Sequence, residues 1–238
     1  MVLAAGLGTR MKPLTDDRPN ALVTVAGTAL IDHMLDRLAQ AGVTRAVVNV
    51  HAHADRLIAH LQARTGLPTI TISDERSAPL PLETGGGVKH ARTLLGEGPI
   101  WIANIDSVWI ERAPALEALA SAWNPARMDT LLLLTHTERA LGFDGPGDFF
   151  MDGDGRLTPR RTLPDAPTAP FAYMGVGVAD PSAAYANSAI EFSLFPIWVE
   201  QAKAGRLFGV VLDGDWMHVG DPQAREDAEA LLASASDG

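Results

Sequence analysis

The 238-residue chain contains no cysteine and only three lysines, Lys12, Lys89 and Lys203, and its formal net charge is −10. The absence of cysteine excludes disulfides, thiolate metal sites and cysteine nucleophiles. So acidic a chain is a poor candidate for binding nucleic acid, because that binding depends on many Lys and Arg contacts to phosphate. Any phosphate that the chain binds must therefore meet a local cationic site.

Long apolar runs are missing as well. No stretch reaches the roughly 20 apolar residues that cross a membrane, and no basic segment precedes an apolar one at the N-terminus. These absences predict no secretory signal and no membrane partner, and they make the cytoplasm the expected location. The hydrophobic content of 47%, in contrast, supports a sizeable core and argues against disorder.

Strand-like and helix-like segments alternate through the first half of the chain. The expected strands cover residues 1–5, 46–50, 68–72, 99–105 and 130–134, and the expected helices cover 30–38, 54–64, 84–95 and 116–123. Thr84 is expected to cap the third of these helices. After residue 135 the pattern weakens into a hairpin at 142–155, an exposed excursion at 162–170, strands at 173–178 and 207–212, and helices at 193–204 and 222–233.

This alternation predicts an α/β fold of three layers, Rossmann-like, with a mostly parallel, mixed central sheet between helices. We expect a single domain, residues 1–238, in which the second half completes the pocket. In such sheets ligands bind beyond the carboxyl ends of the strands. The segments that follow the first strand and the strand at 99–105 are therefore the places to look for chemistry.

The first of these segments is a glycine-rich turn, GLGTR at 6–10, directly after an apolar strand. Glycines let backbone N–H groups approach an anion closely, and Arg10 adds a planar fork of donors suited to phosphate. A tight turn with a surface arginine is the alternative. The Rossmann fingerprint does not fit because position 11 is Met, and the Walker loop does not fit because its G-K-[ST] ending is absent.

The complete run over 4–15, A-A-G-x-G-T-R-M-x-P-L-T, resembles the nucleotidyltransferase family that joins a nucleoside triphosphate to a sugar-1-phosphate. The resemblance extends from Met1 to about Pro222. It implies that residues 1–135 form a nucleotide-binding half and 136–238 a sugar-binding half. It also implies magnesium as the cofactor, and a set of triphosphate-binding residues: Ala5, Gly6, Gly8, Thr9 and Arg10.

Asp106 ends the apolar strand WIANID at 101–106, on the edge where ligands bind. Magnesium prefers hard oxygen ligands and is commonly held by one or two carboxylates together with substrate phosphates. A strand-end aspartate that caps a turn is the alternative. The resemblance implies a metal-binding aspartate here, with Asn104 facing the sugar.

Three glycines, Gly85–Gly87, stand where a helix is expected to start, although each costs that helix roughly 1 kcal/mol relative to Ala. They make sense if something packs directly on the backbone, the alternative being a loose capping loop. The resemblance implies that Gly85 and Gly86 receive the nucleobase. Lys89 approaches phosphate or lies on a solvated helix face, and we favour the surface.

The segment DGDWMHVGDP at 213–222 resembles the W-x-D-x-G-[TD]-P segment of the family, whose aspartate helps to hold the metal. Here His218 takes the place of that aspartate, and histidine is a softer ligand for magnesium than carboxylate. Either His218 orients the sugar phosphate, or Asp221 or Asp215 supplies the missing oxygen. A histidine packed beside Trp216 is the alternative. The resemblance also implies sugar contacts from Gly147, Tyr173 and Gly175.

Asn20 is the main departure, because the family has a lysine in its R-P-K segment and this chain reads Arg18-Pro19-Asn20. Losing a positioned cation from a charge-stabilised transition state costs on the order of several kcal/mol. We therefore count Asn20 with Arg10 and Asp106 as the catalytic positions. We therefore expect the transfer activity to be reduced, to be lost, or to depend on Lys12 in place of the missing lysine.

The motif LETGGGVKHA at 82–91 and the short second half are most similar to the N-acetylmuramate α-1-phosphate uridylyltransferase branch of the family. The expected reaction transfers the nucleotidyl group of a triphosphate, UTP first, to a sugar-1-phosphate and releases pyrophosphate. Mannose-1-phosphate guanylyltransferases, or a nucleotide-sugar binding protein without turnover, are the alternatives. The sequence leaves the oligomeric state open.

Overall fold

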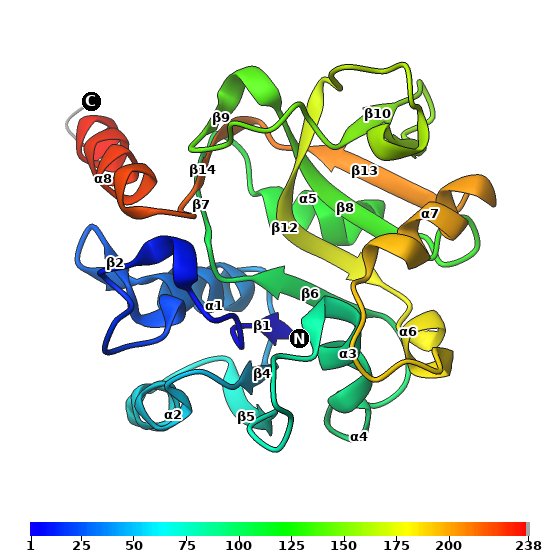
Figure 1. Cartoon of the computed structure of the whole chain (residues 1–238). Coiled ribbons are helices and arrows are strands. Elements are labelled where there is room, and N and C mark those ends of the chain that lie inside the picture. The colour runs from blue at the N-terminus through cyan, green and yellow to red at the C-terminus, as the bar shows by residue number, and fades with distance from the viewer. Residues whose placement is uncertain (237–238) are drawn as a thin grey trace.

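A mixed sheet forms the centre of the molecule in the computed structural model, which describes residues 1–236 (Figure 1). Its strands run in the order β11-β10-β12-β6-β1-β4-β5, with β8 beside β12 and β13 beside β8. The bounds are β1 Val2–Leu3, β4 Arg45–Val50, β5 Thr69–Asp74, β6 Ile100–Asn104, β8 Thr130–His136, β10 Phe149–Met151, β11 Leu157–Pro159, β12 Phe171–Ala179 and β13 Leu207–Val211.

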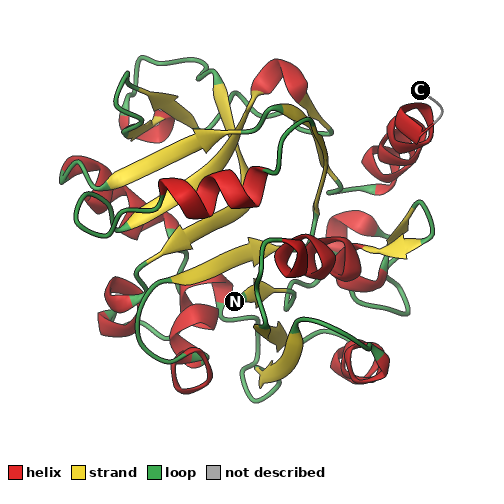
Figure 2. Cartoon of the chain, turned by 180° about the vertical axis from the view of Figure 1, so that it is seen from behind, coloured by secondary structure: helices red, strands yellow, loops and turns green. Residues whose placement is uncertain are grey.

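The helices pack on both faces of this sheet, as Figures 1 and 2 show from opposite sides. Their bounds are α1 Leu30–Gln40, α2 Ala54–Ala63, α3 Glu83–His90, α4 Arg92–Leu95, α5 Ala115–Ala122, α6 Ser182–Ala186, α7 Phe195–Lys203 and α8 Pro222–Ser236. Short 3₁₀ turns are η1 Thr9–Met11, η2 Asn20–Leu22, η3 Thr137–Arg139 and η4 Arg160–Thr162. Within residues 1–236 no helix is both long and apolar enough to cross a membrane.

Successive residues of the central strands point to opposite faces, which explains why these strands are apolar throughout. In β4, Val48 packs into the core under α1 and α2, whereas Val47 packs into the core beneath α3 and α6. In β6, Ala103 packs on the same side as Val48, and Ile102 packs on the same side as Val47. The sheet is thus covered on both sides, and the predicted α/β fold with a mixed central sheet is confirmed.

Strands β1, β4, β5 and β6 run parallel, so their carboxyl ends meet at one edge. Strand β12 runs antiparallel to β6 and joins the second half of the chain to this core. A hairpin is present, formed by β10 and β11, which pair antiparallel, but it lies later than predicted, because β11 follows the Gly- and Asp-rich segment 142–155.

Several element predictions are wrong in detail. The first strand ends at Leu3 rather than Ala5, because the backbone N–H of Ala4 donates to the Asn49 side chain instead of continuing the ladder. The expected helix at 84–95 is two helices, α3 and α4, and Thr84 does not cap it. The Thr84 hydroxyl instead accepts a hydrogen bond from the backbone N–H of Leu194, at 2.9 Å.

A second, three-stranded sheet was not predicted. It consists of β7 (Ser107–Glu111), β14 (Gly214–His218) and β9 (Ala140–Leu141), with β7 and β14 antiparallel. Its register places His218 opposite Ser107, and the N–H of Val219 donates to the carbonyl of Asp106 at 2.9 Å. This sheet therefore carries the 213–222 segment to the end of β6. A small hairpin, β2 (Thr24–Val25) and β3 (Thr28–Ala29), lies beside α8.

Candidate active site

A cavity of about 460 Å³ opens at the carboxyl ends of β1, β4, β5 and β6. The stretch from Leu3 to Met11 forms one wall, and Leu80, Pro81, Glu83 and Thr84 form another. Asn104, Ile105 and Asp106 lie at the end of β6, and single residues from elsewhere complete the lining: Asn20, Asn49, Glu75, Glu191 and Gly220. The cavity is where a sheet of this topology is expected to bind a ligand.

The glycine-rich turn folds back on itself at the mouth of this cavity. Gly8 has a φ of 63°, a left-handed conformation that is unfavourable for residues with a side chain. Its carbonyl accepts hydrogen bonds from the Thr15 hydroxyl at 2.7 Å and from the Met11 N–H at 3.0 Å. Met11 is buried beneath the turn. The turn is thereby fixed to the core. Four of the residues predicted to bind the triphosphate line the cavity, namely Ala5, Gly6, Gly8 and Thr9.

Arg10 is exposed and lines the cavity, and among residues 1–236 its side chain makes no ion pair or hydrogen bond. A guanidinium held without an internal partner is available to bind an anion. Lys12, in contrast, is paired with Asp16 at 3.6 Å and does not line the cavity. Arg10 is therefore the cation that this turn presents to a ligand.

Asn20 lies across the turn from Gly8 at the start of η2 and also lines the cavity. Its side-chain oxygen Oδ1 is buried and has no hydrogen-bond partner in the described part of the chain. An amide acceptor without a donor is costly, so this atom is available to accept a hydrogen bond from a ligand. It does not supply the positive charge that a lysine would supply there.

Asp106 sits at the end of β6 with residues of the second half around it. Nε2 of His218 lies 3.5 Å from Oδ2 of Asp106, and hydrogen bonding to that carboxylate raises the pKa of His218 against the opposite effect of burial. His218 also stacks on Trp216 and contacts the Gly142 carbonyl through Nδ1 at 3.3 Å. His218 therefore packs beside Trp216, as one alternative expected, and it also lies next to the Asp106 carboxylate, whereas its role toward a sugar phosphate stays a prediction.

Tyr173 and Asp148 extend this cluster. Burial raises the pKa of the Tyr173 hydroxyl well above its usual range, and the negative charge of Asp106 adds to the rise. The Tyr173 backbone N–H donates to the Asp148 carboxylate at 2.9 Å, and burial raises the pKa of Asp148, which sequence reasoning did not single out. Asp106, Tyr173 and His218 thus come together from three separate strands or strand ends.

Two of the predicted sugar-binding residues, Gly147 and Gly175, stand where the backbone passes close to neighbouring groups. A side chain on Gly175 would meet Asn104 at 3.0 Å, so Gly175 lets Asn104 reach the cavity. Gly147 has a φ of 81°, and a side chain there would clash with the Ala169 carbonyl at 2.0 Å. Of the predicted sugar residues, Asn104 alone belongs to the cavity lining given above.

For a divalent cation, the described residues offer the Asp106 carboxylate at the end of β6 rather than a closed set of ligands. No group of three acidic or histidine side chains suited to a metal occurs within residues 1–236. Asp221 lies outside the cavity, where its carboxylate accepts a hydrogen bond from the Ala224 N–H at the start of α8. Asp215 is paired with Arg112 and Arg139. Asp106 fits magnesium if phosphate oxygens of a substrate supply further ligands.

The glycines of α3 receive a segment of the chain itself. The N–H groups of Gly85 and Gly86 donate to the Phe192 carbonyl at 2.9 and 3.0 Å, and a side chain on Gly86 would stand 2.3 Å from the Ile190 carbonyl. Lys89 does not line the cavity, and its partly exposed side chain donates to the carbonyls of Asn187 and Ala189. We call residues 187–194 the strap. Gly85 and Gly86 hold this strap and do not line the cavity.

Comparison with known proteins agrees with this geometry. The model of the family described as "Nucleotidyl transferase" matches residues 1–143. The chain belongs to the nucleotidyl transferase family. It is 56% identical to the N-acetylmuramate alpha-1-phosphate uridylyltransferase of Caulobacter vibrioides, over 99% of this chain and 97% of that protein. It is 31% identical to the enzyme of the same name from Neisseria meningitidis, over 98% of each chain.

The fold of this nucleotidyl transferase is also found in solved structures. HddC from Yersinia pseudotuberculosis, in a complex with GMP-PN, superposes with a TM-score of 0.76 over 97% of both chains, at 18% identity. At that identity the likeness concerns the fold. It agrees with the mixed sheet and its helices on both faces.

Sequence reasoning missed two buried polar residues of this nucleotidyl transferase. Oδ1 of Asn49 accepts from the Ala4 N–H at 2.7 Å, and Nδ2 of Asn49 donates to Oε1 of Glu75 at 2.7 Å. Oε2 of Glu75 accepts from the Leu82 N–H at 3.2 Å. Together they tie the glycine-rich turn to the start of α3. The signal was present as Asn49 within the otherwise apolar run AVVNV and Glu75 directly after a strand.

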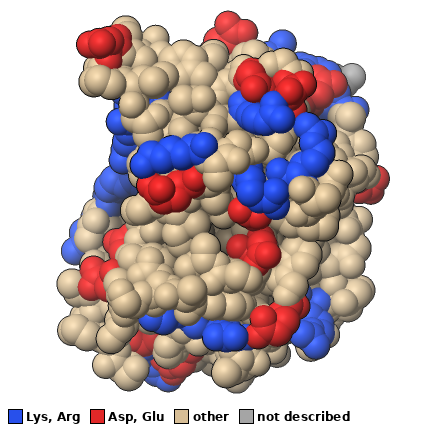
Figure 3. All heavy atoms as spheres, turned by 90° about the vertical axis from the view of Figure 1, so that its right-hand side faces the viewer, with Lys and Arg blue, Asp and Glu red and all other residues tan. Residues whose placement is uncertain are grey.

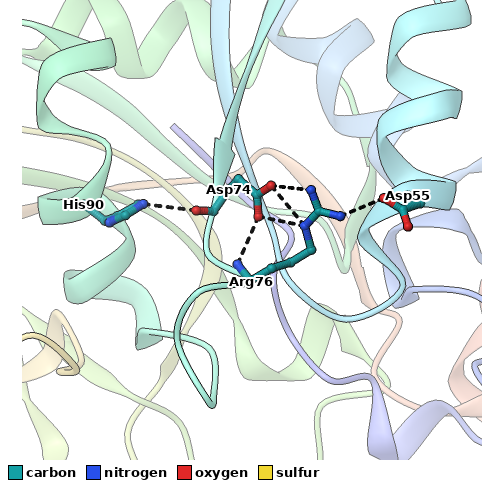
Figure 4. Close-up of polar contacts among 4 residues, drawn as sticks. All are labelled: Asp55, Asp74, Arg76 and His90. Atoms are coloured by element: carbon teal, nitrogen blue, oxygen red, sulfur yellow. Dashed lines mark hydrogen bonds and ion pairs between the residues drawn. The ribbon is translucent and has the colours of Figure 1, made fainter.

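An exposed ion cluster supports the loop that follows Glu75 (Figure 4). Arg76 binds the Asp74 carboxylate through Nη2 at 2.5 Å and reaches Asp55 of α2 at 2.7 Å. His90, at the end of α3, contacts the Asp74 carbonyl at 3.2 Å. These contacts join α2, β5 and α3 beneath the wall that contains Leu80 and Pro81.

Proposed function

We propose that this protein transfers the uridylyl group of UTP to N-acetylmuramate α-1-phosphate, giving the UDP-sugar and pyrophosphate. The observation that carries the proposal is the 56% identity, over nearly all of both chains, to the Caulobacter uridylyltransferase. The arrangement supports it, because a cation without a partner, Arg10, and a carboxylate, Asp106, face one cavity beyond the strand ends. That is the combination that a nucleotide triphosphate and a divalent cation require.

In this proposal the substrates meet in line at the α-phosphorus. An oxygen of the sugar phosphate forms the new P–O bond as the bond to the leaving pyrophosphate breaks, so catalysis rests on positioning and on charge stabilisation. Arg10 and the N–H groups of Gly8 and Thr9 bind the triphosphate, with Ala5 and Gly6 beside them. Asn104, Tyr173 and His218 lie next to Asp106 and are placed to orient the sugar phosphate.

Magnesium is the cofactor that we propose, held by Asp106 together with phosphate oxygens. When bound, it would neutralise phosphate charge and align the reacting groups. The predicted second ligand, Asp221, does not face the cavity, which leaves His218 as the side chain nearest to Asp106 in the 213–222 segment.

A binding protein without turnover is the second candidate, and Asn20 is the observation that favours it. At a position where the family has a lysine, this chain places an amide whose buried oxygen lacks a donor. Such a site retains affinity for the nucleotide through Arg10 but lacks a charge that strengthens as the transition state forms.

One assay separates these candidates. Purified protein with magnesium is offered UTP, GTP or dTTP against N-acetylmuramate, N-acetylglucosamine or mannose 1-phosphate, with pyrophosphate release and sugar-nucleotide product measured. We expect product with UTP and N-acetylmuramate α-1-phosphate, and none from Asp106→Asn, which keeps the side-chain size but removes the charge that holds the cation. Binding of UTP by calorimetry without product identifies the binding protein. Product from GTP and mannose 1-phosphate alone refutes the uridylyltransferase.

A further inference from the structure

Two neighbouring arginines outside the cavity lining, Arg160 and Arg161 of η4, carry charges that the chain leaves unpaired. Most arginines of residues 1–236 form an ion pair with an aspartate or glutamate. Within the same residues, Arg160 and Arg161 form none. A guanidinium without an acidic partner is available to bind an external anion.

The backbone fixes the position of the Arg160 guanidinium. Its Nε donates to the Gly147 carbonyl at 2.9 Å, and the Arg160 backbone N–H donates to the Asp148 carbonyl at 2.8 Å. The side chain is half-buried, and its Nη1 and Nη2 have no acceptor among the described residues. Two parallel N–H donors held in this way match the two oxygens of a carboxylate.

The Asp148 side chain lies between the two arginines and the cluster around the end of β6. Its carboxylate accepts from the Tyr173 N–H at 2.9 Å and forms no ion pair within residues 1–236. Burial raises the pKa of Asp148, whereas the charges of Arg161, Arg160 and His218 lower it. The arginines and His218 therefore act on one carboxylate, which places the arginines on the side of the site where Tyr173 and His218 lie.

A second element faces the arginines. The guanidinium carbon of Arg161 lies 5.4 Å from the centre of the Phe195 ring, and Phe195 begins α7 directly after the strap. Helix α7 packs against β11, which precedes η4 (Figure 1). The strap also contributes Glu191 to the cavity lining. The arginines thus lie between the hairpin and the end of the strap, on the side of the cavity that the second half of the chain forms.

The proposed acceptor carries a second anionic group besides its phosphate. N-acetylmuramate differs from N-acetylglucosamine by a lactyl ether on O3 of the sugar, and this group ends in a carboxylate. The sugar ring separates the carboxylate from the phosphate on C1, so the two anions need separate cationic partners. Arg10 is assigned to phosphate and lies on the first half of the chain, whereas Arg160 and Arg161 lie on the second.

We propose that Arg160 selects the acceptor sugar by binding the lactyl carboxylate of N-acetylmuramate α-1-phosphate through Nη1 and Nη2, with the neighbouring charge of Arg161 adding to the attraction. The inference rests on the proposed function in that this sugar phosphate is the acceptor. It makes Arg160 a specificity-determining residue, distant from the reacting phosphorus.

The test uses three ligands and calorimetry in the presence of magnesium. The ligands are N-acetylmuramate α-1-phosphate, its lactyl methyl ester, and N-acetylglucosamine α-1-phosphate; the last two lack the negative charge. We expect the parent to bind the free acid at least about tenfold more tightly than the ester, as a charged hydrogen-bonded pair predicts. This comparison requires no variant to fold.

Arg160→Gln should then bind the free acid about tenfold to a hundredfold more weakly and bind the two uncharged ligands within about twofold of the parent. Arg161→Gln, which changes an exposed side chain, should lose less, about threefold. Arg45→Gln is the matched control, because Arg45 also lacks an acidic partner within residues 1–236 but begins β4, at the opposite end of that strand from the cavity. Its affinity for all three ligands should equal that of the parent.

Turnover gives a second readout. Because the carboxylate keeps its charge throughout the reaction, Arg160→Gln should raise the KM for N-acetylmuramate α-1-phosphate and leave kcat close to that of the parent. UTP affinity and the melting temperature should stay at the parent values, which a general loss of structure would lower.

Three results would overturn the assignment while leaving the proposed function intact. These are a parent that binds the acid and its ester equally, an Arg160→Gln variant that binds the acid as tightly as the parent, and an Arg160→Gln loss of equal size for all three ligands. An equal loss for the acid in Arg45→Gln would overturn it as well, since the effect would then be one of overall charge. A parent that neither binds nor converts N-acetylmuramate α-1-phosphate would instead refute the proposed function, and this assignment with it.

Discussion

Arg10 carries the anion-binding argument at the scale of single residues. Replacing Arg10 with Ala removes the guanidinium that faces the cavity without an internal partner. Since hydrogen bonds to charged groups contribute about 1.5–3 kcal/mol, we expect UTP affinity to fall by roughly tenfold to a hundredfold in calorimetry. Lys12→Ala is the matched control, because Lys12 belongs to the same turn but pairs with Asp16, and its affinity should match the parent. Equal affinity in Arg10→Ala would place the phosphate site elsewhere.

Asn20 gives a prediction about rate rather than affinity. Asn20→Lys brings an ammonium group to the position where Oδ1 now lacks a donor, so the charge can act on the α-phosphate and on the leaving pyrophosphate. We expect kcat to rise by about tenfold or more with little change in KM, because the contact strengthens in the transition state. Asn20→Met, a neutral chain of similar reach, should not raise kcat. A parent that is already as fast as the lysine variant would show that another group supplies this charge.

The single residues that sequence reasoning found are those whose chemistry is local in the chain. Arg10 follows two glycines and Asp106 ends an apolar strand, and the structure brings both to one cavity. Asn49 and Glu75 were missed because their roles arise when separate strand ends and the start of α3 meet. Contacts between segments so far apart in the sequence cannot be predicted from residue spacing along the chain.

At the scale of elements, the contact between α3 and the strap explains the glycines of 85–87. Gly86→Ala would place a methyl group 2.3 Å from the Ile190 carbonyl, so the strap or the helix must move. Overpacking of this kind costs about 1–3 kcal/mol, which lowers the melting temperature by roughly 2–12 °C in a chain of this size. Gly153→Ala is the control, since nothing lies within 4 Å of the added methyl, and its melting temperature should not change. A Gly86→Ala melting curve identical to the parent would contradict this account of the glycines.

The elements that periodicity predicts are those with an apolar face, such as α1, where Leu30, Met34 and Leu38 are buried. Sequence reasoning missed β7 and β14, because they directly follow other elements or turns and their pairing joins residues about 100 positions apart. That pairing is what brings His218 to Asp106. The glycine-rich start of α3 was correctly interpreted as a place of close packing, and the group that packs on Gly85 and Gly86 among the described residues is the strap, whereas a contact with the base stays a prediction.

At the scale of the whole molecule, the two halves of the chain complete one cavity. Glu191 and Gly220 line it from the second half, and the strap is bonded to α3 of the first. Charged side chains of both signs are interspersed in small groups on the face drawn in Figure 3, so the net charge of −10 does not gather there into one field. The division into a nucleotide-binding and a sugar-binding half stays a prediction that the assays above address.

The stability of the whole molecule should depend on pH through the cluster of Asp55, Asp74 and Arg76. Hydrogen bonding to Arg76 lowers the pKa of Asp74 from 3.8 to about 2. A carboxyl whose pKa is lower in the folded state stabilises the fold above its unfolded pKa, and that contribution is lost as the pH falls from about 4 towards 2. Because both side chains are more than 40% exposed, screening limits the contribution to about 1 kcal/mol or less.

Arg76→Gln should therefore unfold at lower urea than the parent at pH 6, and the difference between the two should narrow as the pH approaches 2. Lys203→Gln is the control, because it breaks an exposed pair with Glu200 within α7 and should leave the urea midpoint unchanged at pH 6. A difference between parent and Arg76→Gln that stays constant from pH 6 to pH 2 would mean that Arg76 stabilises the loop by packing on its neighbours. The charge of Asp74 would then contribute nothing measurable, and the connection of α2, β5 and α3 beneath the cavity wall would rest on the contacts of His90 and the buried core alone.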